Sequence, residues 1–189
     1  MTATPEYVGY VAMSLDGFIA EEDGGVGWLE QFDDTVPAKG AGSYSDFIAR
    51  IDALVMGRTT FEQVIGFGWP YGDLPCYVLT RDTGYSGEHV TAAGGIENLG
   101  AAIASAGHAR VWVVGGGKTQ RTALDAGMFD SAQVFVIADP SGQGHSTFRA
   151  GCRAPASNAV EQPARRRDRN HLQIWGLDRW PRHSHPQAT

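Results

Sequence analysis

Short runs of Val, Ile and Tyr alternate with longer amphipathic segments along the first 137 residues of this 189-residue chain. Each run is apolar at nearly every residue, which is typical of a strand buried on both faces of a sheet. The runs span residues 7–14, 52–57, 76–80, 110–115 and 133–138. Such strands favour a mostly parallel sheet, because parallel strands are joined by crossovers that cover both faces.

The segments between the runs carry apolar residues at three- and four-residue spacing, the pattern of a helix with one buried face. They span residues 43–51, 59–67, 96–107 and 118–129. Gly107 and Gly127 lie where two of these helices should end. We therefore predict a three-layer α/β fold with a mostly parallel central sheet and helices on both faces. Ligands of such sheets bind beyond the carboxyl ends of the strands.

One strand runs directly into a glycine-rich turn, VVGGGKTQ, at residues 113–120. A Walker loop is excluded because Trp112 occupies the position of its first Gly, and the dinucleotide fingerprint GxGxxG is excluded because Gln120 occupies the position of its last. The remaining pattern is a buried strand, a turn without Cβ atoms and a helix whose free N–H groups face the turn. Such a turn binds a phosphate or is a tight strand-to-helix corner.

Two further predicted strands end in residues suited to phosphate binding. The sequence MGRTTFEQV places Gly57, Arg58, Thr59 and Thr60 at the start of a helix, where the threonines can cap N–H groups and the arginine can bind phosphate oxygens. The sequence VLTRD ends a third strand at Thr80 and Arg81. Each feature alone fits a capped helix or a solvated arginine, but three neighbouring strand ends of this kind favour a phosphate site.

The ordered motifs YVAMSLDGFIAEEDGGVGWLEQFDD, MGRTTFE, VLTR and VVGGG resemble the dihydrofolate reductase-like fold. Within it, they resemble the reductase family typified by the C-terminal domain of the bacterial riboflavin-pathway deaminase/reductase. The resemblance covers roughly residues 6–137 and implies a reductase domain over residues 1–139. It also implies NADPH as the hydride donor.

The resemblance assigns roles to residues at the strand ends. Arg58 with Thr59 and Thr60, and Thr80 with Arg81, would hold the cofactor's 2'-phosphate side and pyrophosphate. The helix N-terminus after the glycine turn would hold the pyrophosphate, and Ala12 and Ile19 would offer backbone groups to the nicotinamide carboxamide. The full expected cofactor set is Ala12, Ile19, Gly57, Arg58, Thr59, Thr60, Thr80, Arg81, Gly115, Gly116, Gly117, Lys118 and Thr119.

Candidates for catalysis are a tryptophan and two carboxylates. Asp33 follows Trp28 by five residues, the region where folate reductases carry a Trp and a substrate-binding carboxylate, and Asp16 lies in the SLDGF motif. A partly buried carboxyl group can supply the proton that hydride reduction needs. Asp16 can equally cap a turn, and Asp33 can equally be a solvated surface residue.

Two departures from the family argue against folate as the substrate. Leu74 and Pro75 stand where folate reductases carry an arginine for the substrate's carboxylate, and Gln120 replaces the tyrosine that follows the glycine turn. We expect an NADPH-dependent reductase of a small heterocyclic or carbonyl substrate, acting on a C=N or C=O bond and similar to a pyrimidine-riboside reductase. The alternative is a nucleotide-binding protein with little or no turnover, and a true dihydrofolate reductase is the weaker expectation.

Composition limits the partners and the compartment. The net charge of −6 and the pI near 5.4 offer no basic field for nucleic acid or for an anionic membrane. Cys76 and Cys152 lack the spacing of a zinc site, and no apolar run is long enough to span a bilayer. We expect a cytoplasmic protein without a metal, which binds a small molecule and is compatible with a homodimer.

The C-terminal quarter differs in composition from the rest. The chain carries 7 Lys and Arg against 17 Asp and Glu before Ala138, but 8 Arg against 4 acids from there on. Proline and histidine are also concentrated there, and the composition resembles a GC-rich gene read in another frame. We expect residues 140–189 to be a poorly packed tail, apart from one strand near residues 172–177, so that the family's closing hairpin is in doubt.

Overall fold

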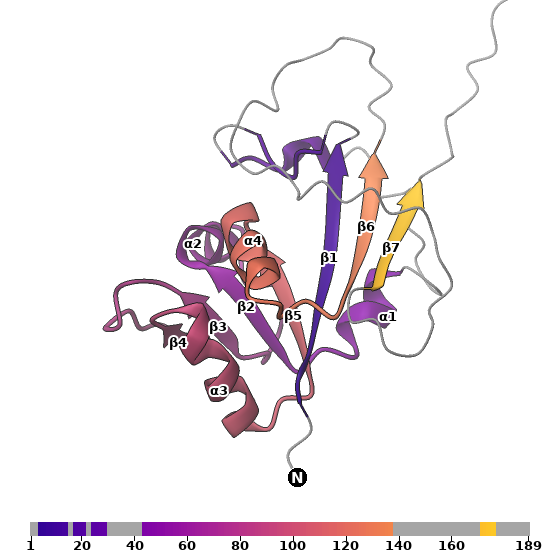
Figure 1. Ribbon diagram of the computed structural model, residues 1–189. Helices are drawn as coiled ribbons and strands as arrows, with labels where there is room; N and C mark the ends of the chain where they lie inside the picture. Colours follow the sequence, from indigo (N-terminus) through magenta and orange to yellow (C-terminus); the bar gives the residue numbers. More distant parts are fainter. Residues whose placement is uncertain (1–3, 15–16, 22–23, 30–42, 138–170, 177–189) are drawn as a thin grey trace, which may run out of the picture.

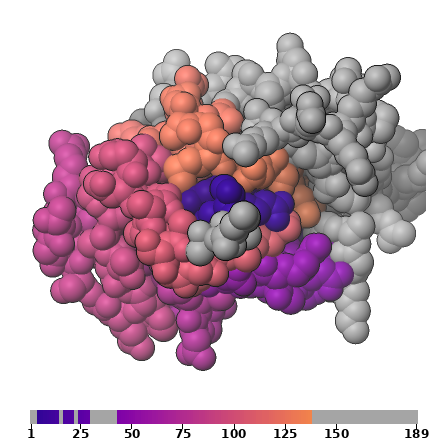
Figure 2. All heavy atoms as spheres, turned by 60° about the horizontal axis from the view of Figure 1, so that its bottom comes forward, coloured from indigo at the N-terminus to yellow at the C-terminus, as the bar shows by residue number. Residues whose placement is uncertain are grey.

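A single sheet of seven parallel strands forms the centre of the computed structural model, which describes residues 4–14, 17–21, 24–29, 43–137 and 171–176 (Figure 1). The strand order is β4-β3-β2-β5-β1-β6-β7. The strands are β1 (Glu6–Ser14), β2 (Ala53–Gly57), β3 (Cys76–Leu79), β4 (Val90–Ala93), β5 (Arg110–Gly115), β6 (Ser131–Ile137) and β7 (His171–Gly176). Viewed from the end where β1 begins, its first residues lie amid those of later elements, as expected for an inner strand (Figure 2).

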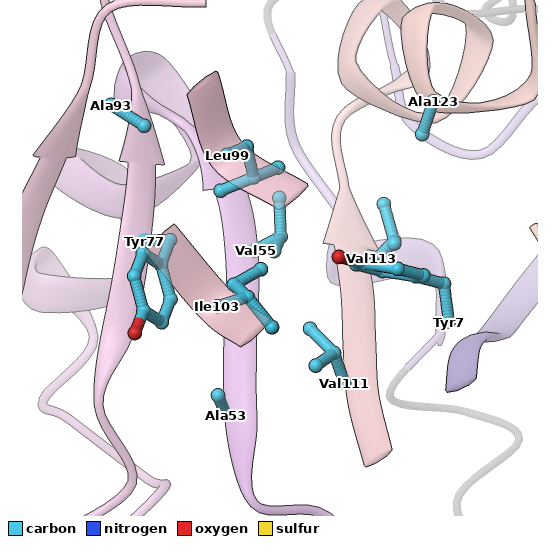
Figure 3. Packing of buried hydrophobic residues seen from close by; sticks show 10 residues of the cluster. All are labelled: Tyr7, Ala53, Val55, Tyr77, Ala93, Leu99, Ile103, Val111, Val113 and Ala123. Carbon is cyan, nitrogen blue, oxygen red and sulfur yellow. The ribbon is translucent and has the colours of Figure 1, made fainter. Parts of the chain in front are cut away.

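The inner strands are buried on both faces, so their alternating side chains build two separate cores. In β2, Ala53 and Val55 face one core while Leu54 and Met56 face the other, and all four are fully buried. Figure 3 shows the first core, where aliphatic side chains of β2 and β5 meet Leu99 and Ile103. The second core is rich in aromatic rings. This double burial explains why the strands read as continuous apolar runs rather than as alternating ones.

The helices cover both faces, as predicted. On the aromatic side lie α1 (Tyr44–Ile48) and α2 (Arg58–Gly66), and on the other side lie α3 (Ile96–Ala106) and α4 (Gly117–Asp125). Ser43 caps α1 by accepting a 3.2 Å hydrogen bond from the Asp46 N–H. Gly107 ends α3 at φ 79°, a left-handed conformation that glycine adopts without strain.

Strands β1 and β5 separate toward their carboxyl ends. Among the described residues their pairing runs from Glu6 and Arg110 only as far as Val8 and Trp112. Beyond that point β5 stays with β2, whereas β1 continues along β6 to Ser14. The crossovers that leave β1 and β5 also run in opposite directions, through α1 on one face and α4 on the other. This strand pair is therefore the topological switch point, where ligands of open α/β sheets bind.

The five predicted strands and four predicted helices are all present, with ends that differ from the prediction by at most four residues. The short edge strand β4 was not predicted, because its sequence VTAA has neither a long apolar run nor a regular alternation. The strand predicted near residues 172–177 is found as β7, paired in parallel with β6. The domain boundary at residue 139 and the rest of the tail lie outside the described residues.

Candidate functional site

Two strand–glycine–helix turns lie side by side at the carboxyl ends of β2 and β5. Gly57 ends β2 and precedes α2, while Gly115 ends β5 and Gly116 precedes α4. Met56 pairs with Gly115 in the sheet, which brings the turns together (Figure 1). Both N-cap residues are glycines and neither helix has a side-chain cap, so the first N–H groups and the positive dipole ends of both helices face the turns. We call residues 57–60 and 115–119 the paired turns.

A threonine from each helix reaches the turn of the other. The Thr60 hydroxyl of α2 accepts a 2.8 Å hydrogen bond from the Gly116 N–H. A Cβ atom on Gly57 would lie 2.7 Å from Thr119 Oγ1 of α4, and one on Gly116 would lie 3.2 Å from Thr60 Oγ1. A side chain at Gly57 would force Thr119 to shift, and one at Gly116 would crowd Thr60 by a few tenths of an ångström.

Gln120 compensates for an irregularity in β5 just before the glycine turn. The register between β2 and β5 shifts so that Val55 pairs with Val113 and Met56 with Gly115, which leaves Val114 without a partner in β2. The buried Gln120 side chain donates a 3.3 Å hydrogen bond from Nε2 to the Val114 carbonyl. Its departure from the family's tyrosine thus has a structural role here. Gly115 has φ 143° and its peptide bond to Gly116 is cis.

Arg58 opens α2 but is already held by three side chains. Its Nε donates a 2.7 Å hydrogen bond to Glu62 Oε1, and its Nη1 lies 3.4 Å from Asp82 Oδ2. Its guanidinium carbon stands 4.3 Å from the centre of the Tyr85 ring. The hydrogen bond with Glu62 is the largest of the causes that raise the pKa of Arg58. We call these four residues the Arg58 cluster; the i,i+4 spacing of Arg58 and Glu62 was its one signal in the sequence.

The end of β3 lies next to the Arg58 cluster. Leu79 pairs with Gly57, so Thr80 and Arg81 follow beside the start of α2. The Thr80 hydroxyl accepts a 3.2 Å hydrogen bond from the Asp82 N–H, which turns the loop back toward Arg58. The Arg81 side chain is exposed.

Two more of the predicted cofactor residues, Thr59 and Lys118, are exposed in the first turns of α2 and α4. The structure therefore brings Gly57, Thr60, Gly116 and Thr119 into direct contact. It leaves Thr59, Arg81 and Lys118 at the rim.

The remaining predicted residues belong to β1 and the segment after it. Ala12 pairs with Phe135 of β6, in the part of β1 that has separated from β5. Ile19 and the partly buried Trp28 lie in the segment that follows β1. Gln63 ties this segment to α2 through a 2.8 Å hydrogen bond from its Nε2 to the Gly24 carbonyl. Asp16 and Asp33 lie outside the described residues.

An aromatic cluster that the sequence did not single out surrounds Tyr10 on β1. The centre of the Tyr10 ring lies 4.6 Å from that of Phe47 and 4.8 Å from that of Phe135. Tyr44 and Trp112 complete the cluster at 5.8 and 6.3 Å. Burial raises the pKa of Tyr10 to about 12, so its hydroxyl keeps its proton at neutral pH. The cluster gives the α1 side of the β1/β5 separation an aromatic, uncharged character.

The described residues contain no group of three His, Cys, Asp or Glu side chains that could hold a metal ion. Within the same ranges, no helix has both the length and the apolar character needed to cross a bilayer.

Known proteins share this architecture. No family model matches the chain. Protein YwjB of Bacillus subtilis (strain 168), whose activity is uncharacterized, is 34% identical over 143 residues, which cover 74% of this chain and 80% of YwjB. The crystal structure of a candidate riboflavin biosynthesis protein from Shewanella sp. PV-4 is 28% identical with a TM-score of 0.58, and covers 70% of this chain and 77% of that chain. The chain belongs to the RibD-type family of the dihydrofolate reductase-like fold.

A more distant structure supports the fold of this RibD-type chain. Dihydrofolate reductase from Enterococcus faecalis, solved in complex with NADP(H) and RAB-propyl, matches with a TM-score of 0.54 at 20% identity, over 82% of this chain and 80% of that chain. The similarity extends to the parallel sheet with helices on both faces, as the sequence predicted.

Proposed function

We propose that this RibD-type protein is an NADPH-dependent reductase that transfers a hydride to a C=N or C=O bond of a small heterocyclic or carbonyl substrate. The paired turns carry the proposal. Two uncapped helix N-termini meet there, and Gly57 and Gly116 leave the backbone bare where a cofactor pyrophosphate can approach. The reductase fold of the neighbours, and the NADP(H) bound by the Enterococcus faecalis enzyme, support the same cofactor.

In this proposal the two turns bind different parts of the cofactor. Backbone N–H groups at the start of α4 would bind the pyrophosphate, with Thr60 and Thr119 holding the turns in place. Arg58 and Arg81 would bind the 2'-phosphate that distinguishes NADPH from NADH. When bound, NADPH supplies the hydride.

The nicotinamide would lie where β1 has left β5. In that region Ala12 and Ile19 would offer backbone groups to its carboxamide, and the substrate would lie on the same side as Tyr10 and Tyr44. We propose Asp16 or Asp33 as the source of the proton and Trp28 as a contact for the substrate ring. Tyr10 is poorly suited to give up a proton, because burial raises its pKa to about 12.

The substrate side argues against folate. Leu74 and Pro75 are partly buried, and Leu74 packs against the aromatic core where a basic side chain would be needed for a carboxylate tail. An unpaired anion against an apolar surface is costly. We therefore expect this protein to turn over dihydrofolate poorly or not at all.

The test is a screen for loss of NADPH absorbance with small cyclic imines, pyrimidine ribosides and carbonyl compounds, with dihydrofolate as the comparator. Substrate-dependent oxidation by at least one small compound, with little or none for dihydrofolate, is the expected result. Efficient turnover of micromolar dihydrofolate would favour the folate reductase alternative. Saturable NADPH binding without oxidation by any compound would favour the nucleotide-binding alternative.

A further inference from the structure

The guanidinium of Arg58 already contacts two carboxylates and an aromatic ring. A guanidinium binds two oxygens at once through its end, using Nη1 and Nη2, or through its side, using Nε and Nη2. Asp82 occupies Nη1 at 3.4 Å, and Glu62 occupies Nε at 2.7 Å. Each two-point arrangement therefore includes one nitrogen that already contacts a carboxylate, while the Tyr85 ring lies against a face of the group.

The two carboxylates are not equally easy to displace. Glu62 lies one helical turn after Arg58 on α2, so the geometry of that short bond is built into the helix. Asp82 belongs to the loop after β3. Its contact with Arg58, at 3.4 Å, is 0.7 Å longer than the 2.7 Å contact between Arg58 and Glu62. Its other carboxylate oxygen, Oδ1, accepts a 3.1 Å hydrogen bond from the Gly84 N–H, which holds the loop independently of Arg58. An incoming phosphate would therefore displace Asp82 first.

We infer that Asp82 is a specificity-determining residue that competes with the 2'-phosphate of NADPH for Arg58. The inference rests on the proposed function and adds to it, because it places a negative charge of the protein at the position that selects between the two cofactors. The 2'-phosphate of NADPH must compete with the Asp82 carboxylate for the Nη1 end of the guanidinium, whereas NADH has no phosphate there and leaves the pair intact. Asp82 thus narrows the preference for NADPH that Arg58 and Arg81 provide.

The experiment compares wild type with Asp82→Asn by equilibrium titration of the full chain with NADPH and with NADH. Asparagine keeps the shape and the oxygen that accepts from Gly84, but it removes the charge that opposes the phosphate. We expect the ratio of the NADH to the NADPH dissociation constant to rise about two- to fivefold, the range of exposed ion pairs. The rise in this ratio should come from tighter binding of NADPH, with NADH affinity unchanged, and the rise should be smaller at high salt.

Asp73→Asn is the matched control, because it neutralises an exposed carboxylate just before the amino end of β3. The ratio should stay at the wild-type value in that variant. A second comparison places Asp82→Asn in an Arg58→Met background, where the substitution should no longer change the ratio. An unchanged ratio in Asp82→Asn, or an equal rise in Asp73→Asn, overturns the role of Asp82 and leaves the reductase proposal standing. Failure of wild type to bind either cofactor overturns both.

Discussion

The two helix-opening turns have the same backbone plan but different surroundings. Gly116 before α4 is bound through its N–H by Thr60, and Gly117 and Thr119 beside it are buried. The start of α2 is exposed, and its Arg58 is surrounded by Glu62, Asp82 and Tyr85. The buried part of the α4 turn offers backbone groups to a ligand, which suits a pyrophosphate common to all nicotinamide cofactors. The α2 turn binds through charge, which suits a group that only some of them carry.

This difference separates affinity from selectivity. A closely packed neutral turn tolerates little change in shape, since side chains in contact have no room to move. An exposed charged cluster tolerates changes in shape, but its effect depends on the balance of charges and on salt. Substitutions in the α4 turn, or of Thr60 that binds it, should therefore weaken both cofactors alike. Substitutions of the charged residues around Arg58 should act on NADPH alone.

Gly116→Val should have the largest effect. Its Cβ would lie 3.2 Å from Thr60 Oγ1 and would bring two methyl groups into the turn that should receive the pyrophosphate. We expect NADPH and NADH both to lose measurable binding, a rise of about 100-fold or more in dissociation constant, or roughly 3 kcal/mol. Titration of each cofactor, with circular dichroism to verify folding, is the measurement.

Gly66→Val is the control for that variant, because a Cβ at this position near the end of α2 would meet no described atom within 4 Å beyond its chain neighbours and its own helix backbone. It should bind both cofactors like wild type. A folded Gly116→Val protein with unchanged NADPH affinity would show that the turn is only a strand-to-helix corner.

Arg58→Met should have a smaller and more selective effect. Removing the guanidinium takes away a charge-assisted contact to the 2'-phosphate, so NADPH affinity should fall about tenfold while NADH affinity changes less than about twofold. Arg121→Met is the matched control, since Arg121 also pairs with a carboxylate four residues ahead, Asp125, on the exposed face of α4. Equal weakening of both cofactors by Arg58→Met would remove the distinction between the two turns.

Thr60→Val should have the smallest effect and act on both cofactors. The substitution preserves the shape but removes the acceptor of the Gly116 N–H, which is part of the rigid link between the turns. We expect a loss of about 1 kcal/mol in the free energy of unfolding and a several-fold loss of affinity for NADPH and NADH together. Thr122→Val is the control, because it removes a hydroxyl that donates a hydrogen bond to the Lys118 carbonyl of its own helix. An equal loss of affinity for NADPH and NADH in Thr122→Val would contradict the role of the hydrogen bond between Thr60 and Gly116 in cofactor binding.

The sequence predicted the layers of the fold because its signals are local. Runs buried on both faces and helices with one apolar face are visible within a few residues, and their alternation implies the parallel order. The edge strand β4 was not predicted, because VTAA has the burial pattern of a half-covered edge strand. There, pairing with β3 decides the structure, and composition does not.

The sequence predicted the positions of the glycines in the site, but it did not predict which charged side chains contact each other there. Gly57, Thr60 and Gly116 belong to ordered motifs, and the structure brings them into contact. The contact between Arg58 and Asp82 joins residues 24 positions apart, one on α2 and the other in the loop after β3, which no local pattern reveals. The aromatic cluster around Tyr10 likewise depends on α1 packing across the sheet. The expected roles of Asp16 and Asp33 remain predictions.

Equilibrium titration of the wild-type chain with NADPH and NADH in the same low-salt buffer tests the central claim most directly. The paired turns predict saturable binding of both cofactors at one site per chain, and Arg58 with Arg81 predicts tighter binding of NADPH. Equal dissociation constants would contradict the role of the charged turn. The absence of saturable binding for either cofactor would contradict the account as a whole.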